Sequence, residues 1–259
     1  MMKPVLTHYP LPDGAVAFST TRKGGRSEGN YASFNINAYC GDDPEVIRAN
    51  RNALAAELNI AAERLIIPHQ VHGTELRLIG PEFFGLREEI KSMLLEGVDG
   101  VLTSMSDVCV GVSTADCIPV LLFDPAHHAV AAVHAGWRGT LQRIVLKSVA
   151  EMRAAYLTDP ADLHAVVGPG ISQEHFEVGD EVYEQFSEAG FAMEQIAQRT
   201  DKWHINLPEC NRIQLLQAGV AADRILMTNV CTFAHADEYF SARRLGVDSG
   251  RIYTGILLH

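Results

Sequence analysis

Short apolar runs alternate with helical patterns along most of the chain. Nine runs read as β-strands, and several are continuously apolar, as expected for strands covered on both faces. They lie at 15–21, 74–80, 98–104, 108–114, 118–124, 129–135, 163–169, 225–231 and 251–258. Patterns with helical spacing occupy 44–59, 139–156, 176–189 and 208–218. The mixture predicts an α/β class, with an α+β sandwich of mixed β-sheets flanked by helices.

The composition indicates a soluble protein with a sizeable core. Of the 259 residues, 47% are hydrophobic and 20% are charged, and we expect a single domain over residues 1–259. No run approaches the roughly 18 apolar residues that a membrane span needs. The start of the chain, MMKPVLTHYPLPDG, lacks the apolar stretch of a secretory signal. We therefore expect a cytoplasmic protein with no membrane contact.

Charge and cysteine usage narrow the class further. The formal net charge of −11 disfavours a nucleic-acid partner, which would normally meet a basic patch. A small anionic substrate stays open, because a pocket can concentrate a few arginines whatever the net charge. The five cysteines are odd in number and scattered, which fits a reducing compartment better than a disulfide framework. The oligomeric state is left open.

The stretch 112–140 holds the densest candidate chemistry. Cys117 lies in a short connector between two apolar runs, and His134 lies where the next run ends. Residues 136–140 then turn into a helix, and strand-to-helix turns are where open α/β sheets place ligands. The helix start offers unpaired N–H groups to an anion, which would explain Arg138 in a turn that usually favours acidic residues. An arginine that only reaches solvent explains Arg138 equally well.

His72 adds a third metal-binding side chain, in the segment Gln70-Val71-His72-Gly73. One thiolate and two imidazoles suit Zn²⁺, and three protein ligands leave a fourth position open, as in catalytic zinc sites. Cys117 follows His72 by 45 residues, and His134 follows Cys117 by 17 residues. This spacing matches no known metal-binding signature. On pattern alone, one cysteine and two histidines in apolar surroundings are more often core residues.

Two further glycine-bearing turns follow strand runs. Arg22 stands after the first run and before two glycines, and Gly168-Pro169-Gly170 follows the run at 163–169. The first loop resembles an anion-binding loop in composition, but it matches neither the dinucleotide fingerprint nor the phosphate-loop motif. Together with the turn at Gly136, these loops would suit a polar pocket at one edge of a sheet.

A series of longer segments runs in order along almost the whole chain: FSTTRKGG, YASFNIN, CGDDPEVIRANR, QVHG, DGVLT, TADCIPVLLFD, VHAGWRGT, VGPGIS, CT with YFSARR, and SGRIYTGI. In these segments the chain resembles the laccase-domain family, also called YfiH-type proteins. The resemblance implies a fold similar to the cytotoxic necrotising factor type and metal ligands at His72, Cys117 and His134. It implies no role for His69. It places substrate contacts at Arg22, Asn35, Gln70, Arg138 and Arg243.

The resemblance also implies a metal-dependent enzyme, for which several activities are described. We expect the purine nucleoside activities. These are phosphorolysis of adenosine, inosine, guanosine or methylthioadenosine to base and ribose 1-phosphate, and deamination of adenosine to inosine. The expected cofactor is one Zn²⁺ per chain with Cu²⁺ as a substitute, and the expected partners are purine nucleoside and phosphate. The main alternative is a peptidoglycan editing factor that hydrolyses wrongly charged UDP-muramyl-amino acid precursors.

Deamination and phosphorolysis place different demands on the residues. Zinc can activate a water for attack on C6 of adenosine, but the cytidine-type deaminase signature is absent, so the general base is unassigned. Asp116, beside Cys117, is a candidate catalytic residue, and a role in supporting the turn explains it equally well. Phosphorolysis needs phosphate held against C1′ of the ribose, which Arg22, Arg138 or the helix start could do.

Three other interpretations, two enzymatic and one structural, fit the residues less well. A thiolate and two imidazoles also form the equatorial set of a blue-copper site. A multicopper polyphenol oxidase, however, needs further histidines, usually in His-x-His pairs, and the chain has none. A cysteine hydrolase would use Cys117 as nucleophile and His134 as base, which leaves His72 without a role. A purely structural zinc site would need a fourth protein ligand, and the sequence offers no convincing one.

Overall fold

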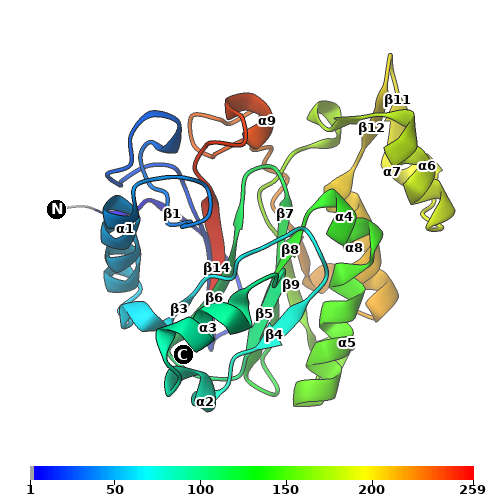
Figure 1. The fold of residues 1–259 in the computed structure, drawn as a ribbon. Helices are drawn as coiled ribbons and strands as arrows, with labels where there is room; N and C mark the ends of the chain where they lie inside the picture. The colour runs from blue at the N-terminus through cyan, green and yellow to red at the C-terminus, as the bar shows by residue number, and fades with distance from the viewer. Residues whose placement is uncertain (1–2) are drawn as a thin grey trace.

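The strands of the computed structural model, which describes residues 3–259, form two large sheets and one small one (Figure 1). The five-stranded sheet has the order β1 (Leu6–Tyr9), β2 (Ala15–Thr20), β14 (Ile252–Leu258), β6 (Val108–Thr114) and β3 (Leu65–Ile66). The six-stranded sheet has the order β13 (Ile225–Met227), β9 (His164–Val167), β7 (Ile118–Asp124), β8 (Ala129–Ala135), β5 (Gly100–Thr103) and β4 (Leu76–Leu78). The small sheet has the order β10 (Glu177–Val178), β12 (Trp203–Ile205) and β11 (Ala197–Arg199).

The helices vary widely in length. The longer ones are α1 (Pro44–Glu57), α3 (Glu88–Leu95), α5 (Ile144–Tyr156), α6 (Asp180–Glu188) and α8 (Leu207–Ala218). The shorter ones are α2 (Pro81–Phe84), α4 (Trp137–Leu141), α7 (Met193–Ile196) and α9 (Ala242–Leu245). Single 3₁₀ turns lie at Gly29–Tyr31, Ala62–Arg64, Pro160–Asp162, Gln173–His175 and Ala222–Arg224. Within residues 3–259, every helix is too short or too polar to span a lipid bilayer.

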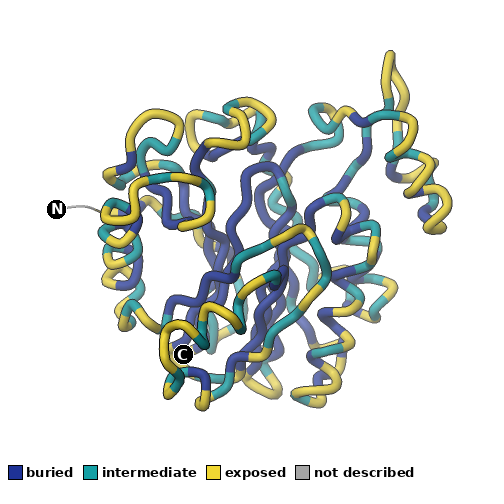
Figure 2. Tube along the Cα trace, viewed as in Figure 1, coloured by how far each residue is buried: buried dark blue, intermediate teal, exposed yellow. Residues whose placement is uncertain are grey.

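The two large sheets pack face to face, and helices cover their outer faces (Figures 1 and 2). Along β7, Leu121 and Phe123 belong to the core between the sheets, whereas Val120 and Leu122 belong to the core under α5 and α8. On the far side, Leu54 of α1 packs with residues of β2, β6 and β14. Because both faces of the central strands are covered, these strands are continuously apolar.

The predicted α/β class with mixed sheets flanked by helices is confirmed, and each of the nine predicted strands is present. Some are shorter than predicted: the run 225–231 ends as a strand at Met227, and Asn229 has a left-handed φ of 53°. The helix expected over 139–156 was wrong as a single element. It is divided into α4 and α5 at Arg143, whose φ of 63° no α-helix accommodates.

Candidate metal centre

Four chain segments meet at one end of the six-stranded sheet. β7 and β8 are antiparallel neighbours, so Cys117, just before β7, comes close to His134 near the end of β8. β5 pairs with the other edge of β8, which brings Asp99, just before β5, to the same place. β4 runs parallel to β5, and the loop that precedes β4 carries His72. The site is therefore assembled by strand register from residues far apart in the sequence.

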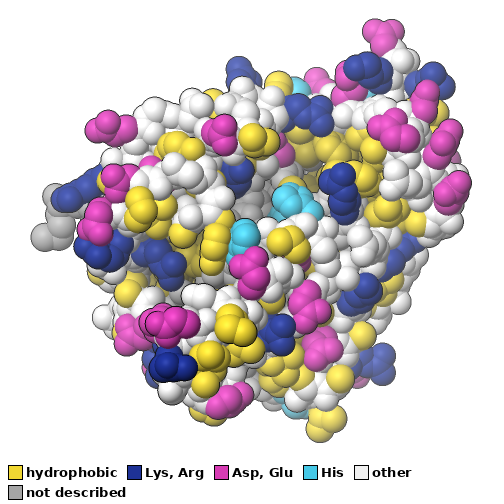
Figure 3. Space-filling view, viewed as in Figure 1, with side chains coloured by type: hydrophobic (Ala, Val, Ile, Leu, Met, Phe, Trp, Pro, Cys, Tyr) yellow, Lys and Arg dark blue, Asp and Glu magenta, His cyan; other side chains and the backbone are white. Residues whose placement is uncertain are grey.

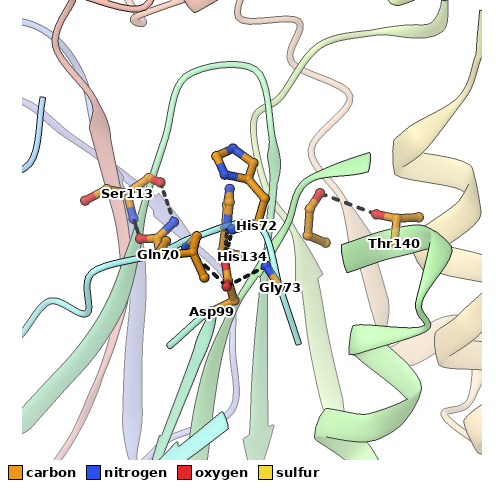
Figure 4. A network of polar contacts seen from close by, with 9 residues as sticks. Gln70, His72, Gly73, Asp99, Ser113, His134 and Thr140 are labelled. Atoms are coloured by element: carbon orange, nitrogen blue, oxygen red, sulfur yellow. Dashed lines mark hydrogen bonds and ion pairs between the residues drawn. The ribbon is translucent and has the colours of Figure 1, made fainter. Parts of the chain in front are cut away.

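The Asp99 carboxylate is the centre of this assembly (Figure 4). It is fully buried, and its Oδ1 lies 2.7 Å from Nδ1 of His134. Oδ1 also accepts the backbone N–H of His72 at 3.0 Å. Oδ2 accepts the N–H groups of Gly73 at 2.7 Å and of Val71 at 3.3 Å. One carboxylate thus fixes the ring of one histidine and the backbone that carries the other.

These hydrogen bonds also explain an unusual backbone conformation. His72 has a φ of 64°, in the left-handed region. Holding a non-glycine residue there costs of order 1–3 kcal/mol, and such a conformation persists only where the surroundings fix it. Here three successive N–H groups, from residues 71 to 73, point at the Asp99 carboxylate. The loop before β4 is therefore shaped to present His72.

The three predicted ligands lie together at this point. One ligand atom from each of His72, Cys117 and His134 can be chosen so that all lie within 4.8 Å of one another. The two imidazole rings are 4.8 Å apart between centroids and are nearly perpendicular. His134 is buried, Cys117 is half-buried and His72 is exposed. The group is thus closed on the side of the sheet and open on the side of His72.

Electrostatics favours the charged form of the thiol. Burial opposes ionisation of Cys117, but the charge of His134 and hydrogen bonds from His134 and His72 outweigh it and lower the pKa of Cys117 to about 6. Burial likewise opposes a charge on His134, yet the Cys117 thiolate and the Asp99 carboxylate raise the pKa of His134 to about 9. Without a metal, the pair is therefore a thiolate and an imidazolium at neutral pH.

Gly136 gives the three side chains their space. A Cβ atom at this position would lie 3.0 Å from Cδ2 of His72 and 3.2 Å from Sγ of Cys117. Both distances are shorter than ordinary van der Waals contacts, so a larger residue would push the ligands apart. The backbone of Gly136 has an ordinary φ of −65°. Close approach, and not backbone freedom, therefore requires glycine at Gly136.

The donor set fits a borderline-soft metal ion. A thiolate and two imidazole nitrogens are the donors that Zn²⁺ binds in proteins, and copper binds the same set. Nδ1 of His134 is already bonded to Asp99, which leaves Nε2 free to bind a metal. A carboxylate behind a ligand histidine is the usual arrangement at zinc sites, because it fixes the tautomer and the ring orientation. His72, Cys117 and His134 therefore form a candidate metal site.

A cavity of about 260 Å³ lies over the three ligands, and Figure 3 shows histidine side chains in a hollow of the molecular surface. Gln70, Ser113 and Arg251 also line it, with Tyr39 stacked on His69 at a centroid distance of 4.0 Å. The remaining lining residues are Asn37, Cys40, Thr114, Ala115, Ala242 and Val247. No carboxylate belongs to the lining among residues 3–259. We call this space the metal cavity.

A second cavity, of about 540 Å³, is larger but lacks the three ligands. It lies at the ends of β9 and β13, and Gln173, Gln198 and His204 contribute to its wall. Gly170, also in its lining, packs against the backbone of Asp116 and Cys117. The turn at Asp116 and Cys117 therefore borders the walls of both cavities. Among residues 3–259, metal-binding side chains converge only at the metal cavity, which makes it the candidate site.

Two of the predicted substrate residues support the metal cavity from within the protein. The Gln70 amide lines it and binds the backbone N–H and C=O of Ser113, at 2.7 and 2.8 Å. Asn35 is fully buried, and its Oδ1 accepts N–H groups of Asn37 and Arg251. Gln70 therefore reaches the cavity, whereas Asn35 holds the backbone of two lining residues.

The three predicted arginines lie outside the lining of the metal cavity. The Arg22 guanidinium donates to the carbonyl oxygens of Ala32 and Ala236, and that of Arg243 donates to Glu177. Arg138 is exposed and stacks on the neighbouring ring of Trp137. Its helix, α4, has only five residues. The structure therefore does not bring these arginines together around the three ligands.

Asp116, the predicted catalytic carboxylate, is tied to other loops. Its Oδ1 accepts the hydroxyl of Thr232 and its Oδ2 accepts the backbone N–H of Arg243, both at 2.7 Å. The backbone N–H of Ile171 donates to the carbonyl oxygen of Asp116, and the φ of Asp116 is 88°. These contacts fix the turn that presents Cys117. The carboxylate of Asp116 is not part of the lining of the metal cavity.

Sequence reasoning missed Asp99 and Arg251. Asp99 stands at the head of a strand of otherwise buried residues, and a charge in such a place is stable only with partners. That position was the available signal. Arg251 occupies the equivalent place before β14, and it lines the metal cavity.

Comparison with known proteins identifies the family of the chain. Residues 16–259 match the family model described as multi-copper polyphenol oxidoreductase laccase. The chain is 46% identical to a purine nucleoside phosphorylase of Bacteroides thetaiotaomicron, over 93% of this chain and 91% of that protein. It is 40% identical to adenosine deaminase RL5, from an unknown prokaryotic organism, over 94% of each.

Two solved structures show the same arrangement of elements. The crystal structure of YlmD from Geobacillus stearothermophilus covers 96% of this chain and 94% of its own, with a TM-score of 0.89 and 31% identity. Neisseria meningitidis protein NMB0706 covers 99% of both chains, with a TM-score of 0.84 and 30% identity. The chain therefore belongs to the multi-copper polyphenol oxidoreductase laccase family, as a homologue of purine nucleoside phosphorylases and of adenosine deaminase RL5.

Proposed function

We propose that the chain is a metal-dependent purine nucleoside enzyme. It cleaves adenosine, inosine, guanosine and methylthioadenosine with phosphate to the base and ribose 1-phosphate, and it deaminates adenosine to inosine. The identities of 46% to a purine nucleoside phosphorylase and 40% to an adenosine deaminase support this proposal. The observation that carries it is the group of His72, Cys117 and His134 at the floor of the metal cavity.

The residues of the chain divide the work between holding a metal and shaping the substrate site. His72, Cys117 and His134 would hold one Zn²⁺, which when bound supplies a Lewis acid and lowers the pKa of water. Asp99 keeps Nε2 of His134 directed at the site by binding Nδ1. Gln70 closes one wall and fixes the end of β6. The exposed side at His72 admits the substrate.

Zinc is the proposed resident metal, with about one ion per chain, because the three ligands leave one position open as in catalytic zinc sites. Copper would replace zinc at these nitrogen and sulfur donors. Among residues 3–259, His72, Cys117 and His134 are the one His/Cys/Asp/Glu group close enough to hold an ion. Oxidation of phenols would therefore be a weak activity of copper-substituted protein. Elemental analysis of protein purified without added metal tests this assignment.

The test of function is turnover of nucleosides with and without phosphate. Purified protein is incubated with adenosine, inosine and guanosine, and the products are separated by chromatography. Conversion of adenosine to inosine should proceed without phosphate, whereas release of hypoxanthine from inosine should require it and yield ribose 1-phosphate. Equal release of base without phosphate would contradict phosphorolysis, and no turnover of any nucleoside would overturn the proposed function.

A further inference from the structure

Arg251 brings a positively charged side chain to the lining of the metal cavity. It directly precedes β14, whose first residue pairs with Thr114 at the end of β6, two residues before Asp116. Asn35 Oδ1 accepts the backbone N–H of Arg251 at 3.1 Å, which fixes where the side chain starts. The chain as a whole carries a formal charge of −11. An arginine in a cavity lined by no carboxylate is therefore a local exception to the charge of the protein.

The contacts of the guanidinium leave its charge uncompensated. Nη1 donates to the carbonyl oxygens of Ser249 and Gly250 and to the Ser249 hydroxyl, and Nη2 donates to the carbonyl oxygen of Val247. These acceptors are all neutral. Within residues 3–259, Arg251 forms no ion pair, and its Nε–H has no hydrogen-bond acceptor. Its side chain is thus held in place and still has a charge and a donor to offer.

Two hydroxyl groups of residues that line the metal cavity also lack partners, on consecutive residues whose side chains point to opposite faces of β6. The Oγ atom of Ser113 and the Oγ1 atom of Thr114 are buried without a hydrogen bond, and both residues line the metal cavity. Buried polar groups are nearly always hydrogen-bonded, so an unpartnered hydroxyl at a cavity wall is available to a water or a bound group. A fixed guanidinium with hydroxyl donors nearby is a common setting for a phosphate group.

We propose that Arg251 binds the phosphate that attacks the nucleoside, which rests on the proposed function. An oxygen of hydrogen phosphate forms a bond to C1′ while the bond from C1′ to the base nitrogen breaks. The electron pair of that bond leaves with the base, which takes the proton of the hydrogen phosphate. The products are ribose 1-phosphate and the neutral base. Arg251 offsets the negative charge of the phosphate and holds it over the three ligands.

This assignment replaces Arg22 and Arg138, which sequence reasoning favoured for phosphate, and Arg243, which the family resemblance placed among the substrate contacts. Like Arg251, Arg22 and Arg243 donate to backbone carbonyl oxygens, but their guanidinium groups also pack on aromatic rings. Arg138 stacks on Trp137 and is exposed. None of the three lines the metal cavity. Arg251 does, and it is therefore the arginine best placed to act on the same substrate as the three ligands.

The two proposed reactions provide the test, because only phosphorolysis uses phosphate. Arg251→Ala and Arg251→Lys are compared with wild type, with Arg244→Ala as the matched control. Arg244 also donates to a backbone carbonyl oxygen, that of Phe233, but it does not line the cavity. The KM for phosphate with inosine should rise at least about tenfold in Arg251→Ala, the effect of losing one charge-assisted hydrogen bond. Arg251→Lys should recover part of that loss, and Arg244→Ala should behave as wild type.

A second readout does not depend on turnover. Inorganic phosphate should raise the thermal unfolding temperature of wild-type protein, since a ligand of the folded state stabilises it, and this rise should disappear in Arg251→Ala. Deamination of adenosine in phosphate-free buffer, which uses no phosphate, should fall by a smaller factor than phosphorolysis. Unchanged phosphate KM and an unchanged thermal shift in Arg251→Ala would overturn the proposal. Equal loss of both reactions would assign Arg251 to loop structure. Wild type without nucleoside turnover would refute the proposed function alone, and the thermal shift would still test Arg251.

Discussion

The two cavities that border the turn at Cys117 differ in what holds their walls in place. The larger one, of about 540 Å³, is bounded by loops and by neutral polar side chains such as Gln198 and Asn229, which are exposed. The metal cavity has about half that volume, and its floor is tied to strand ends by the buried carboxylate of Asp99. Volume alone would select the larger cavity, whereas the proposed site is the metal cavity. Fixed donors of matched chemistry distinguish a reactive site from a space between loops.

Replacement of Cys117 by alanine, in the metal cavity, should have the largest effect on metal binding and activity. It removes the thiolate ligand, so metal affinity should fall by more than about 100-fold, because loss of even a supporting partner costs about 10- to 100-fold. Both proposed nucleoside activities should disappear with the metal, while the fold stays largely intact. Metal content and circular dichroism measure the two effects. Full metal occupancy in Cys117→Ala would refute the assignment of the ligands.

Replacement of Asp99 by asparagine should have the next largest effect. The variant keeps the size of the side chain but loses the negative charge that orients His134 and holds the loop of His72. Metal affinity should fall about 10- to 100-fold. Asp124→Asn is the matched control, since Asp124 is also buried and binds a histidine, His127, but outside both cavities. Equal metal affinities in the two variants would show that Asp99 has no special role.

Replacement of Gly136 by alanine tests the packing of the ligands. The added Cβ would lie 3.0 Å from the ring of His72, so the three donors must move apart by a few tenths of an ångström. We expect metal affinity to fall by less than in Asp99→Asn, at most about tenfold. Gly85→Ala is the control, because its added Cβ would make only an ordinary contact, at 3.6 Å. Competition with a chromogenic chelator gives the affinities, and a Gly136→Ala value equal to wild type would contradict the close approach.

Replacement of Met227 by tryptophan should have the smallest effect. Met227 lines the larger cavity, which a tryptophan would partly fill. Metal content and nucleoside turnover should stay within about twofold of wild type, because residues that share no partners act almost independently. Thermal unfolding shows whether the variant is folded. A folded Met227→Trp protein that binds metal but fails to turn over nucleosides would move the substrate site to the larger cavity.

The sequence predicts the central strands well because strands buried on both faces appear as unbroken apolar runs. β7 and β8 are covered on both faces, and each reads as one apolar run. The strands β3 and β10 have two residues each, too few to show a period. The break at Arg143 was missed because the apolar stripe from Leu141 onward continues across it. Short elements and helix breaks depend on tertiary contacts that a local pattern does not contain.

The metal site was less accessible to the sequence than the fold. Family resemblance grouped His72, Cys117 and His134, since their spacing follows no metal motif and their proximity depends on strand register. Asp99 escaped notice because most of its partners are backbone N–H groups, which leave no side-chain signature. The family resemblance placed Arg22, Arg138 and Arg243 among the substrate contacts, and nearby glycine turns supported the first two. The partners of Arg22 and Arg243, backbone carbonyl oxygens on distant loops, are equally invisible in the sequence.

The Asp99 carboxylate has a consequence for how the protein acquires its ion. It holds His134 and the loop of His72 through contacts that involve no metal, so the ligands are arranged once the chain has folded. In zinc fingers, by contrast, binding and folding are one event, and the metal is chosen while the site forms. A site completed in advance takes whichever suitable ion the surroundings supply, and copper binds more tightly than zinc at such donors. The metal ions present in the growth medium and the purification buffer would therefore decide which ion occupies the site.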